Sequence, residues 1–79
     1  MDHAPTVGRI VHYYNRSWGM MNGIGPYAAI ITAVRNSHTA DLTVFHAGDV
    51  LSNTSKEPAV VWGTGDTDRP QWWQWPPGV

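Results

Sequence analysis

Apolar and polar residues alternate in several short stretches of the chain, and a period of two residues indicates β-strands rather than helices. The first stretch, residues 7–14 with the sequence VGRIVHYY, is rich in β-branched and aromatic residues and is predicted to be a strand. Its two faces carry Ile10, His12 and Tyr14 on one side and Arg9, Val11 and Tyr13 on the other. Neither face is purely polar, so both are expected to be partly covered, as in a strand of a small closed barrel.

Residues 27–35, with the sequence YAAIITAVR, give the strongest strand signal. Three alanines would also suit a helix, but four β-branched residues and the preceding Gly-Pro pair favour a strand. Residues 36–40 (NSHTA) have the composition of a turn, and residues 41–47 (DLTVFHA) return as a strand with Leu42, Val44 and His46 on one face. The two strands and the short turn predict a β-hairpin.

The connections between strands differ in length and in apolar content. Residues 15–26 form a long, glycine-rich loop, which is expected to pack through four apolar residues, Trp18, Met20, Met21 and Ile24. Residues 48–58 are predicted to be a loop with two residues tucked in, Val50 and Leu51. Residues 59–63 (AVVWG) predict a short fourth strand, and residues 64–69 a turn. Residues 71–75 (QWWQW) predict a short fifth strand, which the following two prolines would end.

Four or five short strands in 79 residues predict a single all-β domain that spans residues 1–79. A small SH3-like barrel fits best because the first loop is long, the middle hairpin is tight and the last strand is short. An OB-like barrel is the alternative. Closing a sheet into a barrel also hides its edge strands, which matters in a chain with only 14% charged residues.

Residues 69–79, RPQWWQWPPGV, hold three of the five tryptophans. Aromatic side chains bury about 150–250 Å² each, so this tail is expected to close the barrel or to dock on another protein. Alternation puts Trp73 and Trp75 on one strand face and Trp72 on the other. We therefore predict that one face seals the core and the other contacts an identical subunit or a partner, through Trp72, Trp73, Trp75 and Pro76. A third interpretation, a WPP peptide ligand for an aromatic groove, ranks last.

The charge of the chain is low and evenly spread. The net charge is −1 and the five basic residues are scattered along the sequence, whereas binding to nucleic acid requires clustered lysine and arginine. The longest apolar run, residues 28–31, is far shorter than a membrane span, and the N-terminus lacks signal-peptide features. These features predict a soluble, cytoplasmic protein that binds neither nucleic acid nor membranes. Because cysteine is absent, aromatic packing and self-association are expected to support the small domain.

No residue pattern in the chain specifies catalysis or a metal site. The histidines and nearby acids match no metal-ligand spacing, and the serines form no triad signature; the residues weighed are His12, His38, His46, Asp41 and Asp49. The glycine-rich residues 19–25 (GMMNGIG) precede a strand and lack the Lys-Ser/Thr end of a phosphate-binding loop. The chain is therefore predicted to be a non-enzymatic protein without metal or cofactor.

Four segments form a recognisable pattern: VGRIVHYY at residues 7–14, GPYAAIIT at residues 25–32, LTVF at residues 42–45 and WQWP at residues 73–76. In this order they resemble a group of small proteins encoded by tailed bacteriophages and prophages, over most of the chain. The resemblance implies a phage origin, a compact β fold and a non-enzymatic accessory role, and it carries over no catalytic residue. With the aromatic tail it predicts an assembly module that self-associates or docks on a capsid or tail protein, in the host cytoplasm or in the virion.

An alternative function uses the end of the first strand and the loop that follows it. Stacking of a base or sugar on aromatic rings and an arginine contact to phosphate would make a shallow ligand pocket. The residues predicted for it are Tyr13, Tyr14, Arg16, Trp18 and Asn22. In this alternative the protein binds a nucleotide or a cyclic-oligonucleotide signal and thereby sequesters a signal of host defence.

Overall fold

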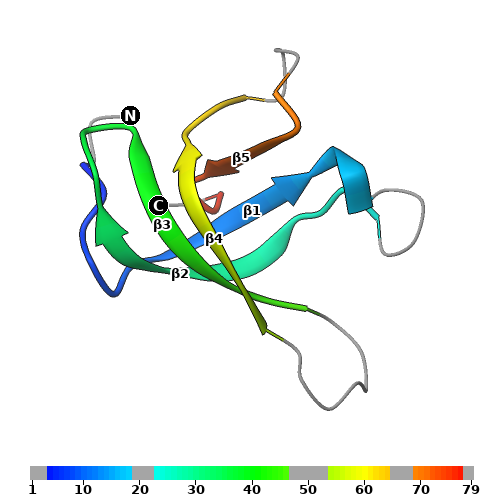
Figure 1. The fold of residues 1–79 in the computed structure, drawn as a ribbon, viewed down its shortest axis with the longest axis horizontal. Helices are drawn as coiled ribbons and strands as arrows, with labels where there is room; N and C mark the ends of the chain where they lie inside the picture. The colour runs from blue at the N-terminus through cyan, green and yellow to red at the C-terminus, as the bar shows by residue number, and fades with distance from the viewer. Residues whose placement is uncertain (1–3, 19–22, 47–53, 65–68, 78–79) are drawn as a thin grey trace.

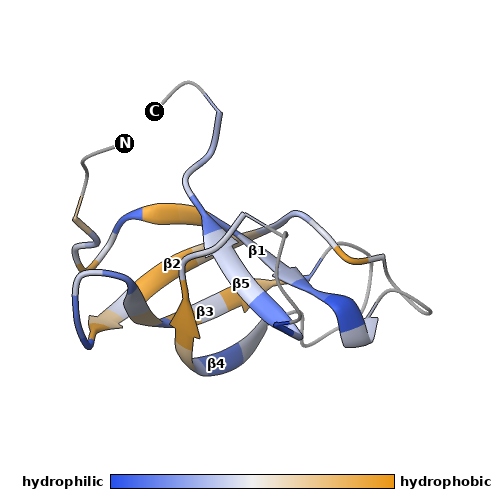
Figure 2. Cartoon of the chain, turned by 90° about the horizontal axis from the view of Figure 1, so that it is seen from above, coloured by the Kyte–Doolittle hydropathy of each residue, from blue (hydrophilic) through white to orange (hydrophobic). Residues whose placement is uncertain are grey.

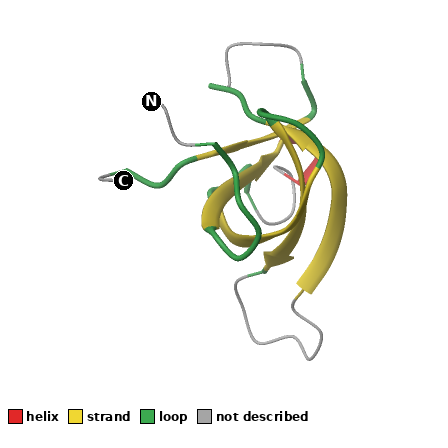
Figure 3. Cartoon of the chain, turned by 90° about the vertical axis from the view of Figure 1, so that its left-hand side faces the viewer, coloured by secondary structure: helices red, strands yellow, loops and turns green. Residues whose placement is uncertain are grey.

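The computed structural model describes residues 4–18, 23–46, 54–64 and 69–77, and five antiparallel strands curl around a common interior in this part of the chain (Figure 1; Figure 3). The strands are β1 (Ile10–Asn15), β2 (Tyr27–Val34), β3 (Thr39–Phe45), β4 (Thr54–Val61) and β5 (Gln71–Gln74), and a 3-10 turn, η1 (Arg16–Trp18), follows β1. Their order in the sheet is β4-β3-β2-β1-β5. The predicted all-β fold is confirmed, and its strand order is consistent with an SH3-like barrel.

The sheet comes round on itself where the end of β4 meets β5. Trp62 forms a parallel bridge with Trp73, and the Gly63 amide donates a hydrogen bond to the Trp73 carbonyl oxygen over 3.1 Å. A Cβ atom added at Gly63 would lie 3.2 Å from the Cβ atom of Trp72, so Gly63 allows a close approach of the Trp72 side chain. The predicted fifth strand is confirmed, and it lies against β1.

Alternate residues of the strands point into the barrel and form its apolar core. Nine of them are at most 1% exposed: Val11, Tyr13, Ala29, Ile31, Ala40, Leu42, Val44, Val60 and Trp73. The shared face predicted for Leu42 and Val44 is confirmed. Strand β4 contributes Val60 from its apolar end, because this strand changes from hydrophilic to hydrophobic along its length (Figure 2).

Asp41 in β3 lies between two irregularities that bend the sheet. The β2–β3 pairing shifts between Ile31 and Ala33, and the β3–β4 pairing shifts on either side of Asp41, opposite Pro58 and Ala59. Ala59 has a φ of 54°, and its amide donates a hydrogen bond to the Asp41 Oδ1 atom over 2.8 Å. Bulges of this kind bend a strand and increase its twist, which helps a short sheet to curl into a barrel.

Several predicted boundaries are wrong. The third strand spans Thr39–Phe45 rather than residues 41–47, so the predicted turn at residues 36–40 is shorter. Residues 54–58, predicted to be loop, belong to β4; their charged residues and proline indicated a loop, but an edge strand tolerates both. The first strand begins at Ile10 rather than at residue 7, because Gly8 has a φ of 93° and the Arg9 amide closes a turn onto the Thr6 carbonyl. The predictions for Met20, Met21, Val50 and Leu51 lie outside the described residues.

Candidate functional site

The tryptophans of the tail pack mainly against their own chain. Trp73 is 1% exposed, its Nε1 atom donates a hydrogen bond to the His38 carbonyl oxygen over 3.2 Å, and its ring meets that of Trp75 edge to face at 5.2 Å. Trp72 points to the opposite side, where it is 5% exposed. Its ring stacks on Tyr14 at 5.2 Å and 5°.

The burial of Trp72 and Trp73 changes the prediction that both are interface residues, because rings covered by their own chain offer almost no surface to a partner. Trp75 and Pro76 remain partly exposed, and their role in an interface stays a prediction. The Arg9 guanidinium lies 5.2 Å from the centre of the Trp75 ring. The tail therefore acts first as a part of the core.

The residues predicted to form one ligand pocket point to opposite faces of β1, because neighbouring residues of a strand alternate. Tyr13 is fully buried and its ring lies 5.3 Å from that of Trp18 inside the barrel end. Arg16 instead lies over the ring of Trp72, at 4.7 Å, on the side where Tyr14 stacks. The pocket as predicted is therefore not formed, and Asn22 lies outside the described residues.

A polar network occupies one end of the barrel interior. The Tyr13 hydroxyl accepts a hydrogen bond from Asn15 Nδ2 at 2.9 Å and donates to Gln71 Oε1 at 2.7 Å, and Glu57 Oε1 lies 3.2 Å away. Burial raises the pKa of the Tyr13 hydroxyl, and the bond from Asn15 opposes this rise. The network joins β1, β4 and β5 through one hydroxyl group.

Aromatic rings lie beside this network, at the same end of the barrel. The Trp18 ring meets Tyr27 edge to face at 5.1 Å and lies 4.6 Å from His46. The His46 Nε2 atom is 2.9 Å from the Ser55 hydroxyl oxygen. Together with Tyr13 these side chains form a mixed aromatic and polar barrel end, which we call the polar end.

The outer face of the sheet carries an exposed apolar surface. Cross-strand pairing places Ile10 opposite Ile30, Ile30 opposite Thr43, and Thr43 opposite Lys56. These four residues form a row across β1, β2, β3 and β4. Ile10 is 58% exposed, and Phe45, on the same face of β3 as Thr43, is 41% exposed. We call the surface of Ile10, Ala28, Ile30, Thr43 and Phe45 the outer patch.

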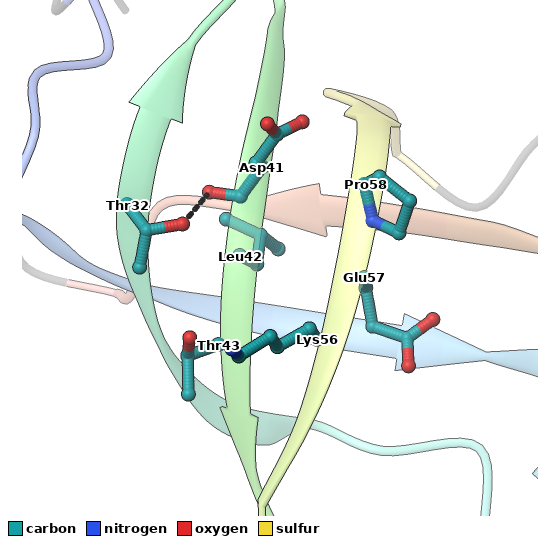
Figure 4. A pocket seen from close by; sticks show the side chains of 7 residues that line it. All are labelled: Thr32, Asp41, Leu42, Thr43, Lys56, Glu57 and Pro58. Carbon is teal, nitrogen blue, oxygen red and sulfur yellow. Dashed lines mark hydrogen bonds between the residues drawn. The ribbon is translucent and has the colours of Figure 1, made fainter.

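A hollow of about 540 Å³ adjoins the outer patch (Figure 4). Its lining comes from β2, β3 and β4 and consists of Thr32, Asp41, Leu42, Thr43, Lys56, Glu57 and Pro58. Figure 4 shows the Lys56 side chain running across the sheet toward Thr43, while Asp41 lies at the other end. The Thr32 hydroxyl donates a hydrogen bond to the Asp41 carbonyl oxygen over 3.2 Å.

Three charged residues line the hollow, and two of them, Asp41 and Lys56, differ in how well their charges are matched. Asp41 accepts a hydrogen bond from Arg35 Nε at 2.6 Å, and this bond and the one from the Ala59 amide hold the pKa of Asp41 below its ordinary value. Lys56 makes no hydrogen bond or ion pair with any described residue. The hollow therefore presents an unmatched positive charge.

The sequence interpretation missed the outer patch and Lys56. Ile10 was assigned to the correct face of its strand, but its neighbours Ile30 and Thr43 follow only from the register between strands. The sequence pattern predicts a loop at Lys56, whereas the structure has it in β4. The alternation of Ser55, Lys56 and Glu57 between partly covered and exposed positions is a weak strand signal that charge and the nearby proline concealed.

Comparisons with protein-family models, with curated proteins and with solved structures find no match for this chain. The fold class therefore rests on strand order and core packing. Within the described segments, no three histidine, cysteine or acidic side chains are placed to hold a metal ion. The same segments contain no helix that is long and apolar enough to cross a membrane.

Proposed function

We propose that this protein is a non-enzymatic interaction module that self-associates or docks on another protein through the outer patch. The observation that carries the proposal is the exposure of Ile10 (58%) and Phe45 (41%) on one sheet face. Large apolar side chains gathered on a surface mark sites of protein contact. The cross-strand neighbours Ile30 and Thr43 carry no charge, so burial of this surface requires no desolvation of an ion.

The resemblance to phage proteins supports a virion protein as the partner, in capsid or tail, with the host cytoplasm as the place of synthesis. The low net charge of −1 supports assembly, because it gives little repulsion between copies. A second proposed contact uses Trp75 and Pro76, which are both partly exposed.

The proposal is tested with Ile10→Ser. Wild-type protein is expected to give, by light scattering, a mass at least twice the 8.8 kDa of one chain, or to be found by mass spectrometry in purified phage particles. Ile10→Ser should lose this assembly while remaining folded, since surface substitutions usually change stability by less than about 0.5 kcal/mol.

Val7→Ser is the matched control, because Val7 is 66% exposed but lies in the turn before β1, outside the outer patch. It should leave assembly unchanged. A wild-type protein that is a single chain in solution and is never found in particles would refute the proposal.

A second candidate function is small-ligand binding at the polar end. It is supported by the amides of Asn15 and Gln71 beside the rings of Trp18 and Tyr27, since barrel mouths with apolar walls and a few polar groups commonly bind small molecules. The Glu57 carboxylate beside Tyr13 disfavours a phosphate group here and favours contact with the base or sugar of a nucleotide.

Thermal-shift measurements with nucleotides and cyclic oligonucleotides test this second function. A ligand of the native state at one hundred times its Kd should stabilise the protein by about 2.7 kcal/mol. The absence of any shift across the set would remove the support for it.

A further inference from the structure

The hollow beside the outer patch is the feature that says most about the partner. Its floor is the middle of β3, and its rim holds the ammonium group of Lys56 and the hydroxyl group of Thr43 (Figure 4). These two residues face each other directly across β3 and β4. The row from Ile10 to Lys56 therefore leads from exposed apolar side chains to an unmatched cation.

Among the residues that the structure describes, Lys56 has no internal counter-ion. The nearest acid on the same rim, Asp41, is already bound by Arg35 Nε at 2.6 Å and by the Ala59 amide at 2.8 Å. The other acid of the lining, Glu57, lies with its Oε1 atom 3.2 Å from the buried Tyr13 hydroxyl. The Thr43 hydroxyl, like Lys56, makes no hydrogen bond with a described residue.

An ammonium group and a hydroxyl group side by side are donors for a carboxylate, and a bond between ions is stronger than one between neutral groups. Of the six acidic residues of the chain, the structure describes Asp41 and Glu57. Asp41 is bound by Arg35 Nε in its own chain, and Glu57 Oε1 lies 3.2 Å from the Tyr13 hydroxyl. Charge complementarity favours as occupant a partner protein with an acidic side chain next to apolar ones.

We infer that the hollow receives a glutamate or aspartate side chain of a partner protein, which Lys56 and Thr43 bind while apolar neighbours of that side chain cover Ile30 and Ile10. This inference rests on the proposed interaction function and specifies the chemistry of its partner. The partner segment is acidic at one position and apolar on either side of it.

The test uses a capped peptide with one glutamate flanked by leucines, and the same peptide with glutamine in place of glutamate. Binding to the full chain is followed by NMR through the backbone amides of Ile30, Thr43 and Lys56. The glutamate peptide should bind about tenfold more tightly than the glutamine peptide, as expected for one hydrogen bond between charged groups.

Lys56→Gln should abolish the preference for glutamate while leaving the spectrum of the folded protein intact, because Lys56 is exposed. Thr43→Val, which keeps the side-chain shape and removes the hydroxyl group, should reduce the preference in part. Arg9→Gln is the control, since it removes one positive charge just before β1, where Arg9 lies over the Trp75 ring. It should leave the preference unchanged.

Three results separate the possible explanations. If Lys56→Gln keeps the full preference for glutamate, the inference is overturned. The proposed interaction function is not affected by this result, because it is tested separately with Ile10→Ser. If sodium acetate or phosphate shifts the same amides as strongly as the peptide, the hollow is a site for small anions and the inference is also overturned. If the glutamate preference is lost in Lys56→Gln and retained in Arg9→Gln, the inference is supported.

Discussion

Replacing Tyr13 by phenylalanine removes a single oxygen atom from the centre of the polar network. The hydroxyl accepts a hydrogen bond from Asn15 at 2.9 Å and donates one to Gln71 at 2.7 Å. The ring itself is fully buried and stays in place beside Trp18, so packing changes little. The substitution therefore isolates the contribution of the hydroxyl group.

The expected loss of stability depends on whether each hydrogen-bond partner of the Tyr13 hydroxyl can find another partner once the hydroxyl is removed. Asn15 is only 7% exposed, so its Nδ2 group is left without an acceptor, at a cost of about 1–3 kcal/mol. Gln71 and Glu57 are partly exposed and can turn toward water. Tyr13→Phe should then destabilise the fold by about 2 kcal/mol, a large part of the roughly 4–12 kcal/mol typical of a domain of this size.

Urea unfolding followed by tryptophan fluorescence measures this difference in the free energy of unfolding. In thermal unfolding, the Tm should fall by about 8–16 °C. Tyr14→Phe is the matched control, because Tyr14 stacks on Trp72 on the outer side and its hydroxyl makes no hydrogen bond with a described residue. It should change stability by less than about 0.5 kcal/mol. Equal effects of the two substitutions would refute the role assigned to the network.

The pH dependence gives a second measurement of the same group. Burial raises the pKa of Tyr13 in the folded chain, so the unfolded chain releases this proton first, above about pH 10. The stability that Tyr13 contributes is present below that pH and is lost as the pH rises further. Wild-type protein should therefore lose stability above pH 10 more steeply than Tyr13→Phe does.

Two further substitutions test the core and the bend in the sheet. Trp73→Ala should destabilise the protein by about 3–5 kcal/mol in urea unfolding. The reason is that the lost side chain is only 1% exposed and donates a hydrogen bond to the His38 carbonyl oxygen. A destabilisation below about 1 kcal/mol would contradict the place of Trp73 in the core. Asp41→Asn should reduce the fall in Tm between about pH 5 and pH 2. The pKa of Asp41 is lowered in the folded chain, so the stability that its carboxylate contributes is present above about pH 4 and is lost as the pH falls. An unchanged slope of Tm against pH would show that the bond to Arg35 does not contribute to stability.

Much of the fold could be predicted because side chains alternate between the two faces of a strand, so buried and exposed positions alternate with the same period of two residues. Leu42 and Val44 share a face in any strand, so their direction follows without knowledge of the neighbours. The strand predicted at residues 59–63 covers the end of β4, but its first part escaped prediction because Lys56 and Pro58 indicate a loop unless the strand lies at an edge of the sheet. That position depends on the order of strands, which local sequence does not contain.

The outer patch was harder to predict because it depends on the register between strands. The predicted ligand pocket combines Tyr13 and Tyr14, although strand alternation places these two residues on opposite faces. Ile30, Thr43 and Lys56 are far apart in sequence and meet only through pairing. The tail tryptophans were correctly given a part in closing the barrel, but how completely Trp72 would be covered depended on Tyr14 and Arg16.

The two irregularities beside Asp41 also determine how freely β3 can slide. A slip of one residue would turn every inward side chain of β3 outward, and it would separate the Asp41 carboxylate from both Arg35 and the Ala59 amide. Because these contacts lie on the two sides of β3, the strand is held in place against β2 and β4 together. A single-residue insertion in β3 should therefore scramble the outer patch.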